Sequence, residues 1–517
     1  MDVKILEKLE LKAPTSFLLI PVLQDKVLEN PLVAEIDRAL RGVIAQLADQ
    51  ESFKAKTGQS LNFNTMGKIG PKRVCFLGLG AAEKLKHETY RRTGGLGADW
   101  LRKFRAEDAT VVCQVPKEVK LTVGDIAGAV VEGLRLGLYR FDKYKSKNDG
   151  EPPYEGPGGV SLFCCDARGK VIKGVKATME AAVRRASILA EGVITARELV
   201  NEIPEVMTPA ELAERARKLS SGIKGLSCRI LDEKEMAAEK MGAALAVARG
   251  SENRPRFIEL IYEPPKVPKT DPLFAMIGKG VTFDSGGLNI KTGEAMTTMK
   301  MDMSGAAAVI SAITIIARLG FPLRCTAVVA AVENMPSGRS YRPDDIIRAM
   351  NGTTIEVGNT DAEGRLILAD ALSWAIHKLG AARVIDLATL TGACVVALGQ
   401  TTAGIFGNDP EWLATVQQAS AEAGEKCCNL PLDEDMSEDI KSEIADVKNI
   451  GATRWGGAIT AALFLQKFVK ETPWVHLDIA GPAWAEKKRH YEPVGGTGYG
   501  VRTLVRLAES LAAKSGE

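Results

Sequence analysis

The C-terminal part of the chain alternates short, almost wholly apolar runs with longer helical stretches, and this pattern limits the folds open to it. Runs of strand length lie at residues 257–262, 273–277, 325–332, 354–357, 384–389 and 474–479. Helical stretches lie between them at residues 305–319, 365–379 and 458–469. Strands that are apolar on both faces are typical of a sheet covered by helices on each side. The pattern predicts an α/β domain with a mixed, largely parallel sheet.

The N-terminal part carries the same alternation, with predicted strands and helices in turn along the chain. The strands are expected at residues 16–22, 73–78, 109–113 and 160–164, and the helices at 83–104 and 123–138. Residues 178–201 are rich in alanine and free of proline, which predicts a long helix. We therefore expect a smaller N-terminal α/β domain over residues 1–175, a connecting helix over 176–201 and a larger C-terminal α/β domain over 202–517.

Charge and cysteine content argue against several classes of protein. The chain has 67 basic and 65 acidic residues, and a net charge of +2 gives no support for nucleic-acid binding. Nine cysteines lack any metal-binding spacing, which is typical of the reduced thiols of a cytoplasmic protein. The N-terminus lacks the pattern of a signal peptide, and glycines interrupt the uncharged stretch 387–408. We expect a cytoplasmic protein with no membrane span.

Charged residues gather where predicted strands end. Five of them directly follow or end such a strand: Lys279, Asp284, Glu333, Asp361 and Glu363. In open α/β sheets, ligands bind at the carboxyl ends of the strands. We therefore expect these side chains to meet at one edge of one sheet.

Each segment also has an ordinary interpretation when it is taken alone. The glycine-rich segment 278–291 fits a solvated turn, and Asp302 fits a cap on the apolar helix that follows it. The two acids Asp361 and Glu363 fit an acid-rich helix start. However, methionines flank Asp302 and offer little to pair with a buried charge.

Taken together, the acidic residues indicate a metal centre. Four crowded carboxylates would repel one another and take up protons unless cations balanced them: Asp284, Asp302, Asp361 and Glu363. Carboxylates that hold two neighbouring divalent ions are typical of two-metal hydrolases. Oxygen ligands suit zinc, manganese, magnesium or cobalt, so the ligand type leaves the metal open. The chain has only four histidines and no HExxH motif, and Ser285 has no histidine near it in sequence, which disfavours histidine-bound zinc and a serine triad.

Several motifs resemble those of the cytosolic leucine aminopeptidase family. Asn359-Thr-Asp-Ala-Glu-Gly-Arg-Leu366 is similar to the signature octapeptide of that family. Other similar blocks are Gly278-Lys-Gly, Phe283-Asp-Ser-Gly-Gly, Glu333-Asn-Met-Pro-Ser-Gly, Thr389-Leu-Thr-Gly, Asp478-Ile-Ala-Gly-Pro-Ala-Trp and Gly496-Thr-Gly-Tyr-Gly-Val-Arg. The blocks keep the family order from residue 195 to the end, while the first 175 residues match only loosely.

The resemblance implies a role for each site residue. The implied metal ligands are Lys279, Asp284, Asp302, Asp361 and Glu363. Asp284 and Glu363 would bridge the two ions, Lys279 with Asp302 would complete the tighter site, and Asp361 would complete the more exchangeable one. The implied catalytic residues are Lys291 and Arg365, with a bicarbonate ion at Arg365 that moves protons. The implied substrate pocket holds Met299, Thr389, Leu390 and Gly392.

The activity that the resemblance implies is removal of the N-terminal amino acid from peptides and amino-acid amides. The first residue would be leucine or another neutral residue, the ions would be two manganese or zinc ions, and the chain would form a homohexamer. Two alternatives stay open at this point, a DNA-binding architectural protein and a two-metal phosphoesterase. Lys279 also has two interpretations, since it could be a neutral metal ligand or a cation that only offsets the carboxylates.

Overall fold

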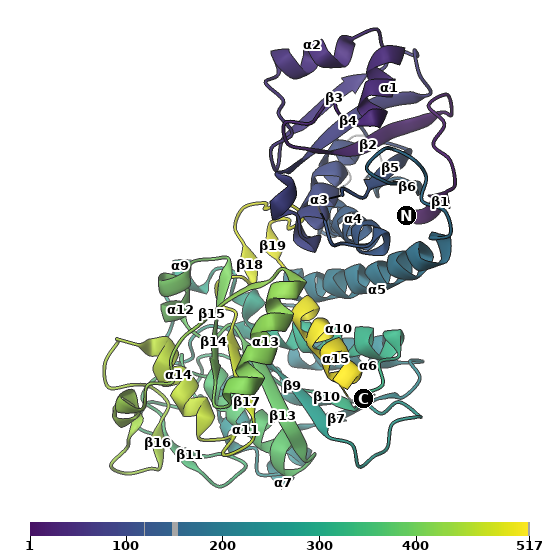
Figure 1. Cartoon of the computed structure of the whole chain (residues 1–517). Coiled ribbons are helices and arrows are strands. Elements are labelled where there is room, and N and C mark those ends of the chain that lie inside the picture. The colour runs from purple at the N-terminus through teal and green to yellow at the C-terminus, as the bar shows by residue number, and fades with distance from the viewer. Residues whose placement is uncertain (118, 147–153, 515–517) are drawn as a thin grey trace. The chain divides into compact units, whose positions relative to one another are not determined.

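The computed structural model describes residues 1–117, 119–146 and 154–514, and Figure 1 labels its helices and strands. The chain divides into two compact units. The first unit holds Met1–Glu191 with Lys487–Pro493, and the second holds Gly192–Glu486 with Val494–Glu517. The division falls inside helix α5 (Lys176–Asn201), where the sequence predicts a long helix.

The first unit is built on one six-stranded sheet with helices on both faces. The strand order is β1 (Asp2–Leu6), β6 (Gly159–Cys165), β5 (Asp108–Gln114), β2 (Thr15–Leu23), β4 (Pro71–Gly80) and β3 (Ser60–Asn64). All neighbours pair in parallel except β3, which runs antiparallel to β4. The helices are α1 (Pro31–Ala39), α2 (Val43–Gln50), η1 (Ala82–Lys84), α3 (His87–Lys103) and α4 (Val123–Leu138).

Strand β2 shows how this sheet divides the unit into two cores. Phe17 and Leu19 join the apolar cluster under α3 and α4, while Leu18 and Ile20 join the cluster under α1 and α2. Successive residues of a strand point to opposite faces, so a run that is apolar throughout can bury both faces. This is the physical reason why the apolar runs predict a covered sheet.

The second unit has an eight-stranded mixed sheet at its centre. Its order is β15 (Lys426–Asn429), β14 (Thr402–Gly407), β17 (Trp474–Asp478), β13 (Ala381–Ala388), β9 (Leu273–Asp284), β10 (Cys325–Asn334), β8 (Arg256–Tyr262) and β7 (Leu226–Leu231). The four central strands β17, β13, β9 and β10 pair in parallel, and antiparallel pairs flank them. The two α/β units confirm the predicted fold class.

Two small sheets and a set of helices surround the central sheet of the second unit. The small sheets are β11 (Ile346–Arg348) with β12 (Thr354–Glu356) and β16 (Val447–Lys448), and β18 (Trp484–Ala485) with β19 (Gly495–Gly496). The helices are α6 (Pro209–Ser220), α7 (Glu233–Ala238), α8 (Gly242–Ala248), α9 (Gly293–Met296), η2 (Met299–Met303), α10 (Ser304–Leu319), α11 (Gly364–His377), α12 (Gly392–Leu398), α13 (Pro410–Ala423), η3 (Glu434–Ile440), α14 (Gly457–Gln466) and α15 (Val501–Lys514).

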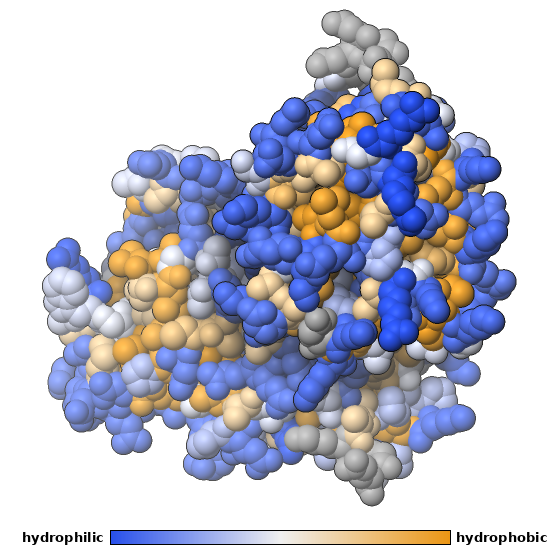
Figure 2. All heavy atoms as spheres, turned by 45° about the horizontal axis from the view of Figure 1, so that its top comes forward, coloured by the Kyte–Doolittle hydropathy of each residue, from blue (hydrophilic) through white to orange (hydrophobic). Residues whose placement is uncertain are grey.

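Within the described chain, one helical stretch, Met299–Leu319, has the length and composition to cross a membrane. Its most apolar 18-residue window is 89% buried inside the second unit, as expected of a core helix. On the face drawn in Figure 2, hydrophobic residues form separate groups among hydrophilic ones. Large exposed apolar side chains of the described chain include Met66, Val396 and Trp455.

One expectation about the sheet is wrong. Strand β12, which precedes Asp361 and Glu363, pairs with β11 and β16 in a small sheet and not with the central sheet. The acids therefore reach the centre from a different sheet than Asp284 does. A three-residue strand cannot be assigned to a sheet from its composition, because pairing partners lie far away in sequence.

Asp370 joins three segments of the second unit and offers a test of the packing. It is fully buried on α11, and its two carboxylate oxygens accept from Ala244 N and Met350 N, each at 2.8 Å. Asp370→Asn would turn an NH2 group toward one of these donors and leave a buried N–H unsatisfied. We expect the free energy of unfolding to fall by about 1–3 kcal/mol, measured by urea titration. The exposed control Asp435→Asn should stay within about 0.5 kcal/mol of the parent, and an equal loss in both variants would contradict this account.

Candidate metal centre

Three segments of the second unit supply Lys279 and the four acidic residues of the centre. Lys279 and Asp284 both lie on β9, which runs to Asp284 and is longer than the sequence predicts. Asp302 lies on η2, and the loop before α11 carries Asp361 and Glu363. Glycines allow this close approach, because a Cβ on Gly278 would lie 2.5 Å from the carbonyl oxygen of Gly305.

Lys279 lies at the buried side of this group and is only 3% exposed. Its Nζ is 2.7 Å from Asp302 Oδ1 and 2.8 Å from Glu363 Oε1. It also donates to the carbonyl oxygen of Thr389 at 2.9 Å. Thr389 Oγ1 donates to the same oxygen of Asp302 at 2.7 Å, so this corner of the centre is closely packed.

Lys291 contacts the other two carboxylates. Its Nζ is 2.8 Å from Asp284 Oδ2 and 2.5 Å from Asp361 Oδ1. The two lysines together therefore touch all four predicted carboxylates. Four negative and two positive side chains leave an excess of negative charge, which favours cation binding.

The oxygen atoms of the centre fit divalent metal ions. Asp284, Asp361 and Glu363 each offer one carboxylate oxygen, and these three oxygens lie within 4.8 Å of one another. Within the described chain, Asp302 Oδ2 and Glu363 Oε2 are buried and accept no hydrogen bond. Buried charged oxygens without donors are costly, and a hard cation would satisfy them. These residues can therefore hold metal.

The pKa directions agree with the crowding of charge. Burial raises the pKa of Asp302, Asp361 and Glu363, and the neighbouring carboxylate of Asp284 adds to the effect. Burial lowers the pKa of Lys279 and Lys291, but the surrounding carboxylates outweigh it and hold both above their usual value. In the metal-free chain both lysines are therefore cationic, and a metal that takes Lys279 as a ligand must displace its proton.

Arg365 lies at the start of α11 and is only 7% exposed. Its Nε and Nη1 are buried and find no acceptor within the described chain. Burial lowers the pKa of this guanidinium to about 10, while Glu363 and Asp478 act in the opposite direction. A buried guanidinium with free donors fits a small anion with several oxygen atoms, such as bicarbonate.

Neutral side chains hold Asp284 and the loop of residues 358–361 in place, and the sequence did not predict this role for them. Asn334 Nδ2 donates to Asp284 Oδ1 at 2.9 Å and to the carbonyl oxygen of Thr360 at 3.0 Å. Tyr341 donates to the same carbonyl at 2.6 Å, and Asn449 Oδ1 accepts from Gly358 N at 2.7 Å. Residues that orient metal ligands in this way tune metal affinity. In the sequence, Asn334 stood only within the family-like block that begins at Glu333, two residues after the predicted strand 325–332.

Glu333 does not join the four carboxylates as the sequence predicts. Its oxygens accept from Ser251 Oγ at 2.5 Å and from Asn253 Nδ2 at 3.0 Å. The neighbouring residue Asn334 contacts Asp284 instead. Adjacent strand residues point to opposite faces of a sheet, so only one of the two can reach the centre.

The predicted pocket residues lie at the centre or within three residues of it along the chain. Thr389 contacts Asp302 and Lys279, and Leu390 is half-buried next to it. Gly392 is exposed and begins α12, whereas Met299 is half-buried and begins η2, three residues before Asp302.

Capping does not explain the acidic residues. Helix α10 has Met303 at its N-cap and no side-chain capping bond, so Asp302 is not a cap. Helix α11 begins after Glu363, whose side chain does not cap it either. The solvated-turn interpretation of segment 278–291 holds only for residues 288–290, which are exposed, because Lys279, Asp284 and Ser285 are buried.

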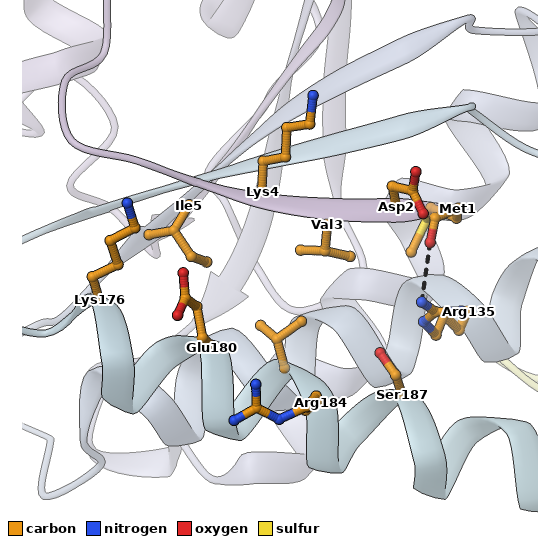
Figure 3. Close-up of a pocket in the computed structure, with 11 residues that line it drawn as sticks. Met1, Asp2, Val3, Lys4, Ile5, Arg135, Lys176, Glu180, Arg184 and Ser187 are labelled. Carbon is orange, nitrogen blue, oxygen red and sulfur yellow. Dashed lines mark hydrogen bonds between the residues drawn. The ribbon is translucent and has the colours of Figure 1, made fainter.

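A separate cavity of about 590 Å³ lies in the first unit, between β1 and α5 (Figure 3). Its lining includes Lys4, Arg135, Glu180 and Arg184, and Arg135 donates to the carbonyl oxygen of Met1 at 3.0 Å. None of the residues that the sequence singles out lines this cavity, so the metal centre is the site that the chemistry favours.

The fold and the centre together define a class, the metal-dependent α/β hydrolases. Comparison with known proteins narrows this class. Residues 194–505 match the catalytic domain of the cytosol aminopeptidase family, and residues 19–148 match the N-terminal domain of that family. The chain belongs to the cytosol aminopeptidase family, and it is a metallo-aminopeptidase.

Curated relatives and solved structures agree with this assignment. A probable cytosol aminopeptidase of Persephonella marina is 45% identical over 476 residues, which cover 92% of this chain and 93% of the relative. One from Aquifex aeolicus is 44% identical and covers 93% of each chain. A mutant of tomato leucine aminopeptidase has a TM-score of 0.86 at 34% identity and covers 99% of this chain and 96% of its own. The bottromycin maturation enzyme BotP in complex with Mn has a TM-score of 0.83 at 34% identity, with 96% and 100% covered.

Proposed function

We propose that this aminopeptidase releases leucine or another neutral residue from the N-terminus of peptides and amino-acid amides by two-metal hydrolysis. The observation that carries the proposal is the group of four carboxylates with two buried oxygens that lack donors. The proposed ligands are Lys279, Asp284, Asp302, Asp361 and Glu363. Two bound ions, manganese or zinc, would act as Lewis acids and make hydroxide available at neutral pH.

Lys291 has the charge and the place to act on the reacting carbonyl. Its ammonium group is within 2.8 Å of Asp284 and its side chain is 15% exposed, so it lies at the open side of the centre. An ammonium group held near the scissile bond would donate to the oxyanion that forms there. We assign it this electrostatic role, together with substrate orientation.

Arg365 cannot act as a base, because a guanidinium stays protonated in proteins. Its free donors Nε and Nη1 would hold a bicarbonate ion, which can accept and return a proton. Four residues would contact the first residue of the peptide: Met299, Thr389, Leu390 and Gly392. Thr389 joins this group to the metal ligands through Asp302.

We also propose a cytoplasmic homohexamer as the working form. The location is supported by the names of the relatives, which are cytosol aminopeptidases. The hexamer is supported by the family resemblance. For the domain organisation we propose an N-terminal domain over residues 1–175, a connecting helix over 176–201 and a catalytic domain over 202–517.

Metal removal and refilling tests this proposal. We expect the chelator-stripped protein to lose turnover of leucine amide, and manganese or zinc to restore it, because the centre depends on the ions for its Lewis acid. The same samples should not hydrolyse p-nitrophenyl phosphate. If the refilled protein hydrolyses the phosphate but not the amide, a two-metal phosphoesterase replaces the proposal. If it hydrolyses neither and binds DNA with an affinity that falls with salt, a DNA-binding protein is favoured.

A further inference from the structure

Asp478 is a buried carboxylate that no step so far uses. It is the last residue of β17 and is only 1% exposed. Its side chain forms no ion pair within the part of the chain that the structure describes. Buried carboxylates without a paired cation are kept only where several donors satisfy them.

Two of the three donors to the Asp478 side chain come from the substrate segment, residues 389–392. Asp478 Oδ1 accepts from Leu390 N at 3.2 Å and from Ala480 N at 3.1 Å. Asp478 Oδ2 accepts from Thr391 Oγ1 at 2.6 Å. Two of these three bonds therefore fix the backbone of Leu390 and the hydroxyl of Thr391, consecutive residues of the substrate segment.

The same segment is held from its other end by the metal ligands. Thr389 contacts Lys279 and Asp302 through its carbonyl and its hydroxyl. Thr391 Oγ1 also accepts from Cys394 N at 3.0 Å and so starts α12. Residues 389–391 thus span the distance between the metal centre and Asp478, and Leu390 lies in the middle.

The turn after Asp478 packs against the far end of the same helix. A Cβ on Gly481 would lie 2.2 Å from the carbonyl oxygen of Gly399, the residue that ends α12. The segment 478–481 therefore contacts both the start and the end of this short helix. The charge of Asp478 also acts on the guanidinium of Arg365 and opposes the lowering of its pKa by burial.

We infer that Asp478 is a positioning residue, whose carboxylate fixes Leu390 and Thr391 so that the pocket selects the first side chain of the peptide. This inference rests on the proposed aminopeptidase function. Asp478 does not touch the reacting atoms, so its loss changes substrate binding and selectivity more than the rate of the chemical step. Metal binding by the five proposed ligands stays intact.

The test compares leucine amide with alanine amide in the metal-loaded full chain. Asp478→Ala should raise KM for leucine amide about tenfold and lower the leucine-to-alanine ratio of kcat/KM, since it removes two bonds to the segment. Thr391→Val removes one of the two bonds to Asp478, together with the bond that Thr391 Oγ1 accepts from Cys394 N, and it should raise KM about threefold and lower the same ratio. Asp478→Asn keeps an acceptor for both N–H groups and should restore the parent KM within about threefold. All variants should keep the metal content of the parent.

Asp386→Ala is the matched control for a merely structural loss. Asp386 is also fully buried in the same sheet, and its oxygens lie 2.6 Å from His476 Nδ1 and Trp474 Nε1. It should destabilise the fold without changing the leucine-to-alanine ratio. If Asp478→Ala does not fold, the inference is tested by comparing the leucine-to-alanine ratio of Thr391→Val and Asp478→Asn with that of Asp386→Ala.

Two results would overturn the inference and leave the proposed function intact. The first is an active parent whose leucine-to-alanine ratio of kcat/KM stays unchanged in Asp478→Ala or in Thr391→Val. The second is a change of this ratio in Asp386→Ala that equals the change in Asp478→Ala. A parent that cleaves neither amide would instead overturn the proposed function, and the inference with it.

Discussion

Replacing Lys279 with arginine is expected to lower kcat/KM for leucine amide by about 10³-fold or more, as the loss of a group at the centre of the reaction does. Arginine keeps the positive charge but has no neutral form in proteins, so it cannot donate a lone pair to a metal. If Lys279 is a metal ligand, the variant should also lose tight binding of one of two ions. Metal content per chain after dialysis against a weak chelator measures this directly.

The packing around Lys279 calls for a second variant. A Cβ on Gly364 would lie 2.5 Å from Lys279 Cε, so the larger arginine has little room. Lys279→Met removes the nitrogen with little change in volume, and it should show the same losses while thermal unfolding stays cooperative. Retention of two ions and normal turnover in Lys279→Arg would mean that Lys279 only offsets the carboxylates.

Lys291→Ala is expected to lower kcat for leucine amide by about 10²–10³-fold with little change in KM, since one donor to a forming oxyanion has that effect. The ammonium of Lys291 now pairs with Asp284 and Asp361. Its removal takes a competing cation away from these proposed ligands, so the metal affinity should be equal or higher. Slow turnover with full metal content would identify a catalytic loss and not a metal-binding loss.

Lys291→Arg separates charge from geometry in this experiment. Arginine keeps the charge, but its longer, planar head places the donors differently. We expect partial recovery of kcat at most. A kcat for Lys291→Ala within about tenfold of the parent would contradict the oxyanion role.

The strands that the sequence predicted well are those that bury both faces. The predicted helix 123–138 also matches α4 to the residue, and in the structure Thr122 and Asp125 form a capping box at its start. The edge strands β1 and β3 were missed, because they expose alternate residues and carry no continuous apolar run. The extension of β9 was missed for a different reason. Its glycines were interpreted as a loop, but Gly278 provides the close approach to α10 that lets Lys279 and Asp302 meet.

The charged residues of the centre could be predicted because several of them occur together after or near apolar runs, although the same signal wrongly included Glu333. The structure brings Lys279, Asp284, Asp302, Asp361 and Glu363 together, although the roles of the individual ligands stay predictions. The neutral supports could not be predicted in the same way. Asn334 and Asn449 act through amide contacts between segments that lie far apart in sequence, which leaves no local pattern.

The measurement that tests the central claim most directly compares leucine amide with N-acetyl-leucine amide at equal concentration, using the manganese-loaded protein. The two substrates share the scissile bond and the leucine side chain, and differ in the free amine. An aminopeptidase requires that amine, so we predict rapid release of ammonia from leucine amide and none from the acetylated substrate. Equal rates on both would contradict the claim that this centre acts on peptide N-termini.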